Sequence, residues 1–420
     1  MGRPSISERV LPLADQASWS LAGIALSVAV ARSSAGAAEL GRWAIAVGVL
    51  MLLAGIHGSL LLDPMLVLSS RHSRRETRAY AYRCAHLTLG LSVLAIPAAV
   101  VWSVLAGPSL AGPVGVTLAT FPAILCSWTL RRAPYTLRAS SAAALGSFAY
   151  FLLVVAALGG FGLASAEVNA TRAAVIVGAA STAHILVMRL MWPPTRDRKV
   201  PQRMRLADHW QYGRWMLPVS ATKNMGNFGL PLIVYAVSGA DVAGRLRAAL
   251  VPATALGLAF SITAVSQVSD ISRQVGAGHL GSARSQVTVL ARIFGGLGLV
   301  SCAAVAAFGE PIVVAVFGQE FTGLRWSLVL VIAAVAVTGV ADAAAVGVRA
   351  VLEPKRLLAP AVLGTLTAVL GTLLFSGWET TGASLAMLCG ALVSTTLVLV
   401  GLRRTPLGTG SNRSSEQSSS

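Results

Sequence analysis

Long apolar stretches alternate with short polar connections along almost the whole chain. Each stretch approaches or exceeds the roughly 20 residues that an α-helix needs to cross a bilayer. The pattern predicts twelve membrane-spanning helices, with approximate limits 11–31, 43–66, 84–106, 112–130, 140–163, 172–191, 212–237, 248–268, 289–316, 326–347, 357–376 and 381–402. The segments 112–130 and 248–268 are the least regular, because proline or polar residues interrupt them. The expected fold class is an all-α polytopic membrane protein.

The basic residues in the connections predict the orientation of these spans. Cytoplasmic loops of membrane proteins carry an excess of arginine and lysine. With the N-terminus in the cytoplasm, most of the 33 basic residues fall on the cytoplasmic side, and the opposite side holds only Arg32, Arg42, Arg172, Arg245, Arg247 and Arg325. One missed span would invert every later connection, so this bias supports the number of spans as well. We therefore expect both termini in the cytoplasm.

The most basic connection, Arg189–Arg214, lies near the middle of the chain and predicts its division into two halves. We expect an N-terminal six-helix bundle at 1–195, a cytoplasmic linker at 196–211 and a C-terminal six-helix bundle at 212–404. Six spans per half would give both halves the same orientation and make any repeat a parallel one. The remaining 405–420 is rich in glycine, serine and asparagine, which predicts a disordered cytoplasmic tail.

A short pattern supports such a repeat. A small-residue external loop precedes Gly41-Arg42 in the first half and Gly244-Arg245 in the second half. Taken alone this is weak evidence, because the chain contains 41 glycines.

Composition excludes a water-soluble protein. Hydrophobic residues make up 55% of the chain, charged residues only 12%, and the mean hydropathy is +0.72. The net charge of +17 would suggest a nucleic-acid partner in a soluble protein, but these charges are scattered over short loops. We therefore expect the lipid bilayer, and no nucleic acid, as a partner. Arginine far outnumbers lysine, and alanine and glycine are abundant, which is typical of a GC-rich bacterial genome.

No pattern in the sequence indicates an enzyme, a metal site or a cofactor. The cysteines, Cys84, Cys126, Cys302 and Cys389, lie in or beside apolar stretches and lack metal-ligand spacing. Nucleophile-elbow, zinc-protease and phosphate-loop motifs do not occur. The predicted external loops are short and leave little room for a catalytic loop. We expect a protein that is not an enzyme and needs neither metal nor cofactor.

Four stretches resemble a known family of membrane proteins. "LADQASWSLAGIALSVAVAR" (13–32) is similar to the first span of bacterial polysaccharide-biosynthesis flippases of the MATE-like (multidrug/oligosaccharidyl-lipid/polysaccharide exporter) superfamily. The stretches 39–71 and 212–256 resemble the second span and the start of the second half in that family. "GEPIVVAVFGQEF" (309–321) resembles a superfamily signature in the loop after the ninth span. Family members more often have glutamate where this chain has Asp63.

The resemblance implies a V-shaped transporter fold of two six-helix bundles around a cavity that opens alternately to the two sides of the membrane. It implies transport of a lipid-pyrophosphate-linked oligosaccharide or polysaccharide precursor from the inner to the outer leaflet of a bacterial plasma membrane. Protons or sodium ions would be the coupling ions, and other glycan-assembly membrane proteins are candidate partners. An anionic substrate of this kind calls for a cationic cavity.

Lys223 is the strongest candidate for contact with such a substrate. It lies well inside the predicted span 212–237, where a charge is costly and therefore a functional candidate. Helical spacing places Ser220, Lys223 and Asn227 on one face, with Asn224 beside it. Pro218 and Pro231 bracket this stretch, and we expect them to break the helix and free carbonyls to line a cavity. The alternative is a lysine paired with a carboxylate for packing alone.

Carboxylates provide a second group of candidates. Asp15 with Gln16 matches the polar first span of the family and is a candidate cavity residue. Asp342 is the candidate for binding a coupling proton or sodium ion. Asp63 lies at the cytoplasmic end of its span. Each of the three aspartates has the alternative role of pairing with loop arginines.

Further candidates are His57, His184, Arg32, Arg245 and Arg247. The two histidines are expected to hydrogen-bond between helices, with a proton relay as the alternative. The arginines flank the predicted external mouth, where they would receive a pyrophosphate or simply reach the membrane interface.

Three functional classes remain open on the sequence. The first is the lipid-linked glycan flippase, and the second is a multidrug or organic-cation antiporter of the same superfamily. The third is a non-transport membrane subunit or enzyme of a glycan pathway. The sequence does not identify the glycan, the coupling ion, the direction of transport or the oligomeric state.

Overall fold

The computed structural model describes residues 6–65, 74–105, 107–136, 140–193, 206–351 and 354–405. These residues form helices joined by short turns, and no strand occurs among them. The α-helices are α1 (Ile6–Ala31), α2 (Gly36–His57), α4 (Arg74–Ser92), α5 (Ala95–Leu105), α6 (Pro108–Thr136), α7 (Ser140–Leu163), α8 (Ala170–Met191), α9 (Leu206–Asn224), α10 (Leu230–Ser238), α11 (Ala240–Gly276), α12 (Leu280–Phe317), α13 (Arg325–Ala350), α14 (Leu358–Leu374) and α15 (Glu379–Arg403). The predicted all-α fold class is confirmed.

Ten segments of the described chain are long and apolar enough to cross a membrane. They correspond to ten of the twelve predicted spans. The other two predicted spans, 11–31 and 212–237, are also helical but contain more polar residues. Asp15 and Gln16 lie in the first of them, and Lys223 and Asn224 lie in the second. Most of the candidate site residues therefore lie in the two predicted spans that are not among these ten segments.

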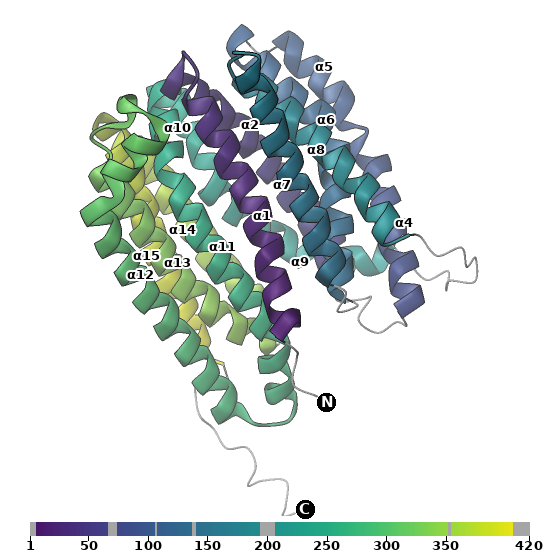
Figure 1. Cartoon of the computed structure of the whole chain (residues 1–420). Coiled ribbons are helices and arrows are strands. Elements are labelled where there is room, and N and C mark those ends of the chain that lie inside the picture. Colours follow the sequence, from purple (N-terminus) through teal and green to yellow (C-terminus); the bar gives the residue numbers. More distant parts are fainter. Residues whose placement is uncertain are drawn as a thin grey trace, which may run out of the picture. The chain divides into compact units, whose positions relative to one another are not determined.

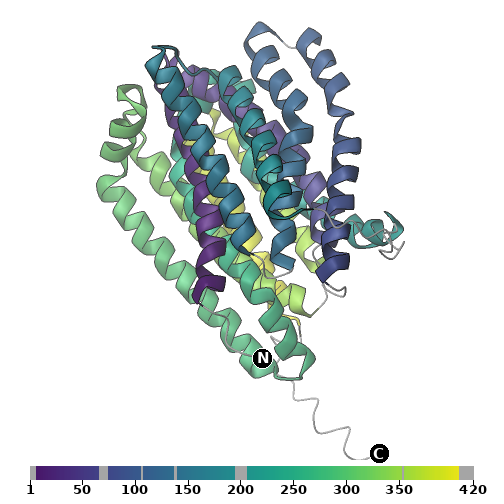
Figure 2. The same cartoon turned by 45° about the vertical axis from the view of Figure 1, so that its right-hand side comes forward.

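The first compact unit comprises Met1–Val251 and Val313–Thr322. Within it, α6 packs against α4, α5 and α8, while α1 lies along α7 (Figures 1 and 2). One buried core joins α4, α6 and α8 with the end of the second span through Leu62, Met65, Tyr80, Cys84, Leu130, Met188 and Trp192. The predicted irregular span 112–130 is one uninterrupted helix that accommodates Pro113 and Pro122.

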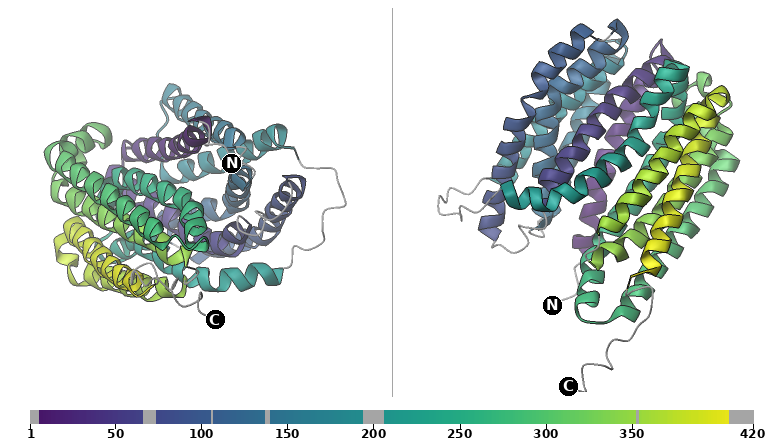
Figure 3. Two further views of the ribbon diagram at one scale, coloured as in Figure 1. Left: turned by 90° about the horizontal axis from the view of Figure 1, so that it is seen from below. Right: turned by 180° about the vertical axis from the view of Figure 1, so that it is seen from behind.

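Helices from the second half of the sequence complete this first unit by packing on α2. The chain of α9, α10 and the start of α11 changes direction as it runs past the neighbouring helices (Figure 3, right). Glycines permit a close approach along this seam: a Cβ on Gly48 would overlap the Phe228 carbonyl, and one on Gly55 would overlap the Asn224 amide. On α9, a Cβ on Gly213 would overlap the Ser59 carbonyl in the same way as one on Gly48 would overlap the Phe228 carbonyl.

Two helical segments that pack against each other each contain one π-helical turn. One segment is α2 with its continuation, and the other is α9 with α10. The π-turns are η1 (Gly58–Leu62), directly after α2, and η2 (Met225–Gly229), between α9 and α10. The expectation that Pro218 and Pro231 break the helix is wrong. Pro218 lies inside α9 and Pro231 lies in the first turn of α10, and the backbone between them stays helical through η2. The irregularity is instead the π-turn η2, with its i→i+5 hydrogen-bonding pattern.

The second compact unit comprises Pro252–Ile312 and Gly323–Ser420. Its core joins α11, α12 and α13 and includes a stacked pair, Phe260 and Phe294, with ring centroids 4.5 Å apart. Helix α15 packs against both α13 and α14. Along the α14–α15 contact, Gly364 and Gly390 each lie against the carbonyl of the other.

The boundaries of the compact units differ from the predicted halves. Both α11 and α12 begin in one unit and end in the other, and the divisions fall at Pro252 in α11 and beside Pro311 in α12. The predicted linker 196–211 lies outside the described residues up to 205, and its remainder forms the start of α9. The predicted tail 405–420 also lies outside them, except for Thr405. The division into bundles at 1–195 and 212–404 stays a prediction.

Candidate functional site

A buried ion pair between Asp15 and Arg131 forms the centre of a polar network in the first unit. Asp15 on α1 is 2% exposed. The Arg131 guanidinium on α6 donates through Nε to both carboxylate oxygens, at 2.9 and 3.0 Å, and its Nη2 lies 2.8 Å from Oδ2. The planar fork of arginine suits this multidentate contact with a carboxylate.

Two neighbouring side chains form further hydrogen bonds with this pair. Arg131 Nη2 also donates to Gln16 Oε1 at 2.8 Å, and the Ser147 hydroxyl on α7 donates to Asp15. Three helices thus contribute to one network around a single carboxylate. A buried charge is tolerated when it is paired and hydrogen-bonded in this way.

Aromatic rings from α1, α6, α7 and α8 lie beside this network. The Arg131 guanidinium lies over the ring of Trp19, 4.9 Å from its centroid, in a cation–π contact. Trp19 also stacks on Tyr150 at 3.9 Å between centroids and meets the edges of Trp128 and His184. The positive charge of Arg131 therefore has both a carboxylate and an aromatic partner.

Helix α6 extends this network through two hydroxyl–histidine contacts. Ser127 Oγ lies 2.9 Å from His184 Nδ1, and Thr129 Oγ1 lies 3.3 Å from His57 Nε2. Thr88 on α4 approaches the same His57 nitrogen at 3.0 Å. The prediction that both histidines hydrogen-bond between helices is confirmed. Their other ring nitrogens, His57 Nδ1 and His184 Nε2, are buried without a hydrogen-bond partner among the described residues.

Asp63 also pairs with α6. Its carboxylate lies 3.7 Å from the guanidinium of Arg132, and both side chains are partly exposed. This agrees with the predicted alternative role of Asp63, pairing with an arginine, although Arg132 lies on a helix and not in a loop. Helix α6 therefore uses four polar side chains to contact four different helices or turns. These residues are Ser127, Thr129, Arg131 and Arg132.

The Lys223 region uses its polar side chains partly for packing on α2. The Asn224 amide donates to the Met51 carbonyl at 3.0 Å, and the Ser220 hydroxyl lies 3.5 Å from the Gly55 carbonyl. Lys223 is half-buried in the last turn of α9, directly before the π-turn η2. The side chain of Asn227, on η2, lies outside the described residues. The predicted face of Ser220, Lys223 and Asn227 is therefore only partly tested.

Asp342 lies in the second unit. It is half-buried on α13, close in sequence to Ala343 and Val346 of the α11–α12–α13 core. Its predicted role in binding a coupling ion stays a prediction.

Two of the three predicted external arginines, Arg32 and Arg245, contact backbone carbonyls, whereas the Nε atom of Arg247 is buried without a hydrogen-bond partner among the described residues. Arg32 donates through Nε to the Val316 carbonyl at 2.8 Å and also contacts the Ala315 carbonyl, at the end of α12. Arg245 donates to the Thr322 carbonyl at 2.5 Å. Both guanidiniums are therefore occupied by the segment Val313–Thr322 in this structure.

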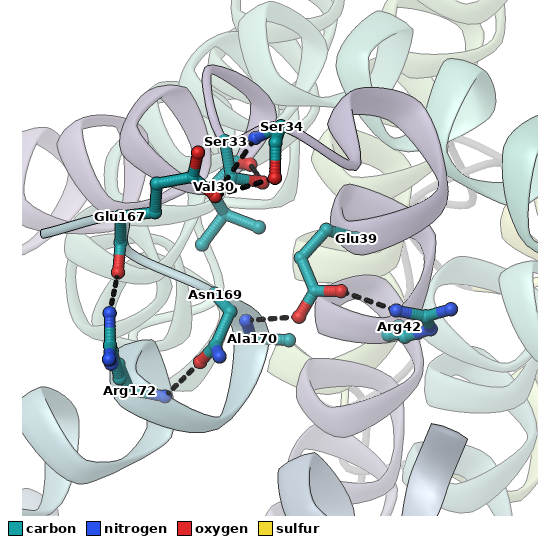
Figure 4. Close-up of polar contacts among 9 residues, drawn as sticks. All are labelled: Val30, Ser33, Ser34, Glu39, Arg42, Glu167, Asn169, Ala170 and Arg172. Atoms are coloured by element: carbon teal, nitrogen blue, oxygen red, sulfur yellow. Dashed lines mark hydrogen bonds and ion pairs between the residues drawn. The ribbon is translucent and has the colours of Figure 1, made fainter. Parts of the chain in front are cut away.

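The same end of the first unit contains a set of loop contacts, shown in Figure 4. Glu39 accepts hydrogen bonds from the Ala170 amide at 2.7 Å and from Arg42 at 2.6 Å. Glu167 accepts from the Ser34 hydroxyl and amide at 2.7 and 3.1 Å, and these bonds lower the pKa of this exposed carboxyl. The turn between α1 and α2 is thereby tied to the turn between α7 and α8.

Sequence reasoning found Asp15 and Gln16 but missed their partners Arg131, Ser147 and Trp19. In the sequence, Arg131 directly follows the apolar stretch 112–130 and therefore resembles a cytoplasmic loop arginine. Only the packing of α1 against α7 and beside α6 reveals that its side chain turns inward. The adjacent pair Arg131-Arg132 gave no signal that one of the two would be buried.

Comparisons with known proteins identify the fold. No family model matches the sequence, and no curated protein matches it at the level of sequence. The structure is similar to an inward-facing multidrug resistance MATE family transporter of the MOP superfamily, with TM-score 0.72 and 15% identity over 92% of this chain and 94% of that one. It is also similar to a MOP superfamily transporter from Pyrococcus furiosus described as having a binding pocket of reverse polarity, with TM-score 0.67 and 17% identity over 94% and 93%.

A third similar structure is the lipid II flippase MurJ in an inward closed conformation. Its TM-score is 0.66 at 11% identity, over 95% of this chain and 88% of MurJ. At these identities the similarity concerns the fold and not the substrate. The chain has the MATE-like fold that these transporters and this flippase share.

Proposed function

We propose that this protein is a membrane transporter that moves a lipid-linked oligosaccharide or polysaccharide precursor from the inner to the outer leaflet by alternating access. Two kinds of evidence support the proposal. The fold is one that multidrug transporters and a lipid II flippase share. The stretches 13–32 and 309–321 resemble polysaccharide-biosynthesis flippases in particular.

The observation that carries the choice of an anionic substrate is the position of Lys223. It occupies the last turn of α9, directly before the π-turn η2, within the predicted span 212–237. π-turns occur frequently at functional sites, and an ionisable residue within a membrane span is a functional candidate by default. A compact ammonium group is suited to a pyrophosphate, which it binds as a point charge.

The Asp15 network bears on the alternative of an organic-cation antiporter. A buried carboxylate beside stacked aromatic rings would suit an organic cation. In this protein the guanidinium of Arg131 already fills that place, lying on Asp15 and over the Trp19 ring. An organic cation would have to displace a charge held by three direct contacts with the carboxylate. The anionic substrate is therefore the better supported proposal.

The test uses variants of Lys223 in the full-length protein, reconstituted in vesicles that contain a lipid-pyrophosphate-linked glycan. Lys223→Ala should abolish movement of the glycan to the opposite leaflet, while Lys223→Arg should keep part of the activity because it keeps the charge but changes its geometry. Both variants should elute as monodisperse protein in detergent. Transport of an organic cation by the wild-type protein under the same ion gradient is the competing outcome.

Two results would contradict the proposal. Well-folded Lys223→Ala protein with full glycan transport would remove Lys223 from the mechanism. Aggregated Lys223→Ala protein would instead indicate a structural ion pair, whose disruption costs about 3–5 kcal/mol when it is buried.

A further inference from the structure

A short sequence pattern occurs in both halves of the chain. The residues Gly36-Ala37 and Gly41-Arg42 have the same spacing and order as Gly239-Ala240 and Gly244-Arg245. In both copies the first glycine has a positive φ, +43° for Gly36 and +89° for Gly239. Glycine adopts this conformation readily. In both halves such a glycine lies where a helix begins: Gly36 is the first residue of α2, and Gly239 directly precedes α11.

The two copies pack directly against each other within the first unit. A Cβ on Gly41 would overlap the Ala240 carbonyl, and a Cβ on Gly244 would overlap the Ala37 carbonyl. The contact is therefore reciprocal, as expected for two equivalent surfaces related by a two-fold axis. Because no side chain separates the backbones, the crossing of α2 and α11 leaves no space for water or substrate. The pattern that was weak evidence in the sequence is a tight helix crossing in the structure.

The segment Val313–Thr322 closes around this crossing. Arg32 binds carbonyls at the end of α12, Arg245 binds the Thr322 carbonyl, and Glu320 accepts from the Ala37 amide at 3.0 Å. Positive-φ glycines lie within and just after the segment: Gly318 at φ +120° and Gly323 at φ +77°. We call the glycine crossing together with these contacts the outer seal.

The outer seal accounts for the composition of the compact units. Residues 240–251 of α11 and 313–322 of α12 and its following turn belong to the first unit, although the rest of both helices belongs to the second. The Arg245–Thr322 contact joins these two stretches to each other, and the other contacts of the seal join them to the turn between α1 and α2 or to the start of α2. The divisions fall at or beside Pro252 and Pro311, where a helix lacks a backbone hydrogen bond and bends at lower cost.

We propose that the outer seal is the gate on the predicted external side of the transport path, closed in this structure, and that it opens by separation of α2 from α11 and release of Val313–Thr322. The proposal rests on the proposed transport function. It also assigns Arg32 and Arg245 as gate residues, which hold backbone carbonyls while the gate is closed. A static contact between the halves is the competing interpretation.

A reversible cross-link tests whether the seal must open. The Ala37→Cys and Ala240→Cys pair, joined by a short bifunctional thiol reagent in membranes, should lose glycan transport and regain it after reduction. The wild type is the control for the natural thiols, which are buried or half-buried. Full transport by the cross-linked protein would show a static contact, and failure to cross-link would show that the crossing does not exist in the membrane.

A labelling experiment tests the gate without any glycan substrate. Ala248 is fully buried one turn further along α11 from Gly244. In an Ala248→Cys background, Gly41→Val or Gly244→Val should each increase labelling by an impermeant maleimide added outside by about tenfold, because a side chain at either position holds the helices apart. Gly23→Val on α1, where a Cβ meets nothing within 4 Å, should leave labelling unchanged.

The two experiments separate the gate from the proposed substrate. Increased labelling by the glycine variants, combined with no glycan transport by the wild type, would keep the gate and overturn the substrate. Unchanged labelling in both glycine variants of monodisperse protein would overturn the gate, whatever the wild type transports. The reciprocal contact further requires that Gly41→Val and Gly244→Val act alike, so a large difference between them would also contradict the proposal.

Discussion

At the scale of single residues, Arg131 shows how this chain accommodates a charge inside a helical bundle. Its side chain is only 13% exposed, and its guanidinium contacts both the Asp15 carboxylate and the ring of Trp19. Gln16 and Ser147 satisfy further hydrogen bonds of the pair. Desolvation of the two charges is costly, so the pair is stable only as a complete network. The contributions of these residues to the free energy of unfolding should therefore be strongly coupled.

A double-mutant cycle measures this dependence. Asp15→Asn alone should lower the free energy of unfolding by about 3–5 kcal/mol, because it leaves the Arg131 charge uncompensated. Adding Arg131→Gln should restore a large part of that loss. Gln16→Ala, which removes one peripheral hydrogen bond, should cost only about 1 kcal/mol and is the matched control. Denaturant titration in detergent gives the values, and additive effects of the two substitutions would disprove the coupling.

At the scale of elements, α2 is the helix on which parts of both halves meet. Its glycines Gly41, Gly48 and Gly55 recur at intervals of about two helical turns, so they lie on nearly the same face. They contact, in order, the start of α11, the π-turn η2 and the end of α9. Small residues allow helix backbones to approach closely in membranes, where packing rather than hydrophobicity drives association.

The atoms that face these glycines differ, and this predicts a ranking of alanine substitutions. Gly48→Ala places its methyl group against the Phe228 backbone carbonyl, which cannot move independently, and should cost about 1–3 kcal/mol. Gly55→Ala meets the terminal amide of Asn224, which can rotate away by giving up its hydrogen bond to the Met51 carbonyl, and should cost about 1 kcal/mol. Gly90→Ala on α4 meets nothing within 4 Å and should be neutral or slightly stabilising. Thermal unfolding of the three variants checks the order, and equal effects would disprove the close seam.

At the scale of the whole molecule, contacts within the first unit bring together the loops that the distribution of basic residues predicts to lie outside the membrane. Ser34 contacts Glu167, Ala37 contacts Glu320, and Gly41 lies against Ala240. The turns after the first, fifth, seventh and ninth predicted spans therefore lie at one end of this unit, as the alternation of basic residues requires. The external side and the cytoplasmic termini remain predictions of the sequence.

Reporter fusions test this topology directly. Fusions after Arg132, Lys355 and Arg404 should report the cytoplasm, whereas fusions near Ala166, Ala240 and Thr322 should report the outside. The reason is that most basic residues lie in the connections on the first side of the membrane and only six lie on the second. Enzymatic reporters active on only one side of the membrane give the readout. A fusion of the wrong sign, reproduced with a second reporter, would eliminate the twelve-span arrangement.

The sequence by itself determined the helical class and most of the spans, because a bilayer requires long apolar helices and such a helix is visible as a local pattern of apolar residues. It also located Asp15, Gln16 and Lys223, since a polar residue stands out within an apolar stretch. It did not reveal that Arg131 turns inward to Asp15, that a π-turn follows Lys223, or that Gly41 and Gly244 touch. Those features depend on which helices become neighbours. That choice is made by packing between segments far apart in the chain, where one missing Cβ or one inward-facing guanidinium decides how closely two helices approach.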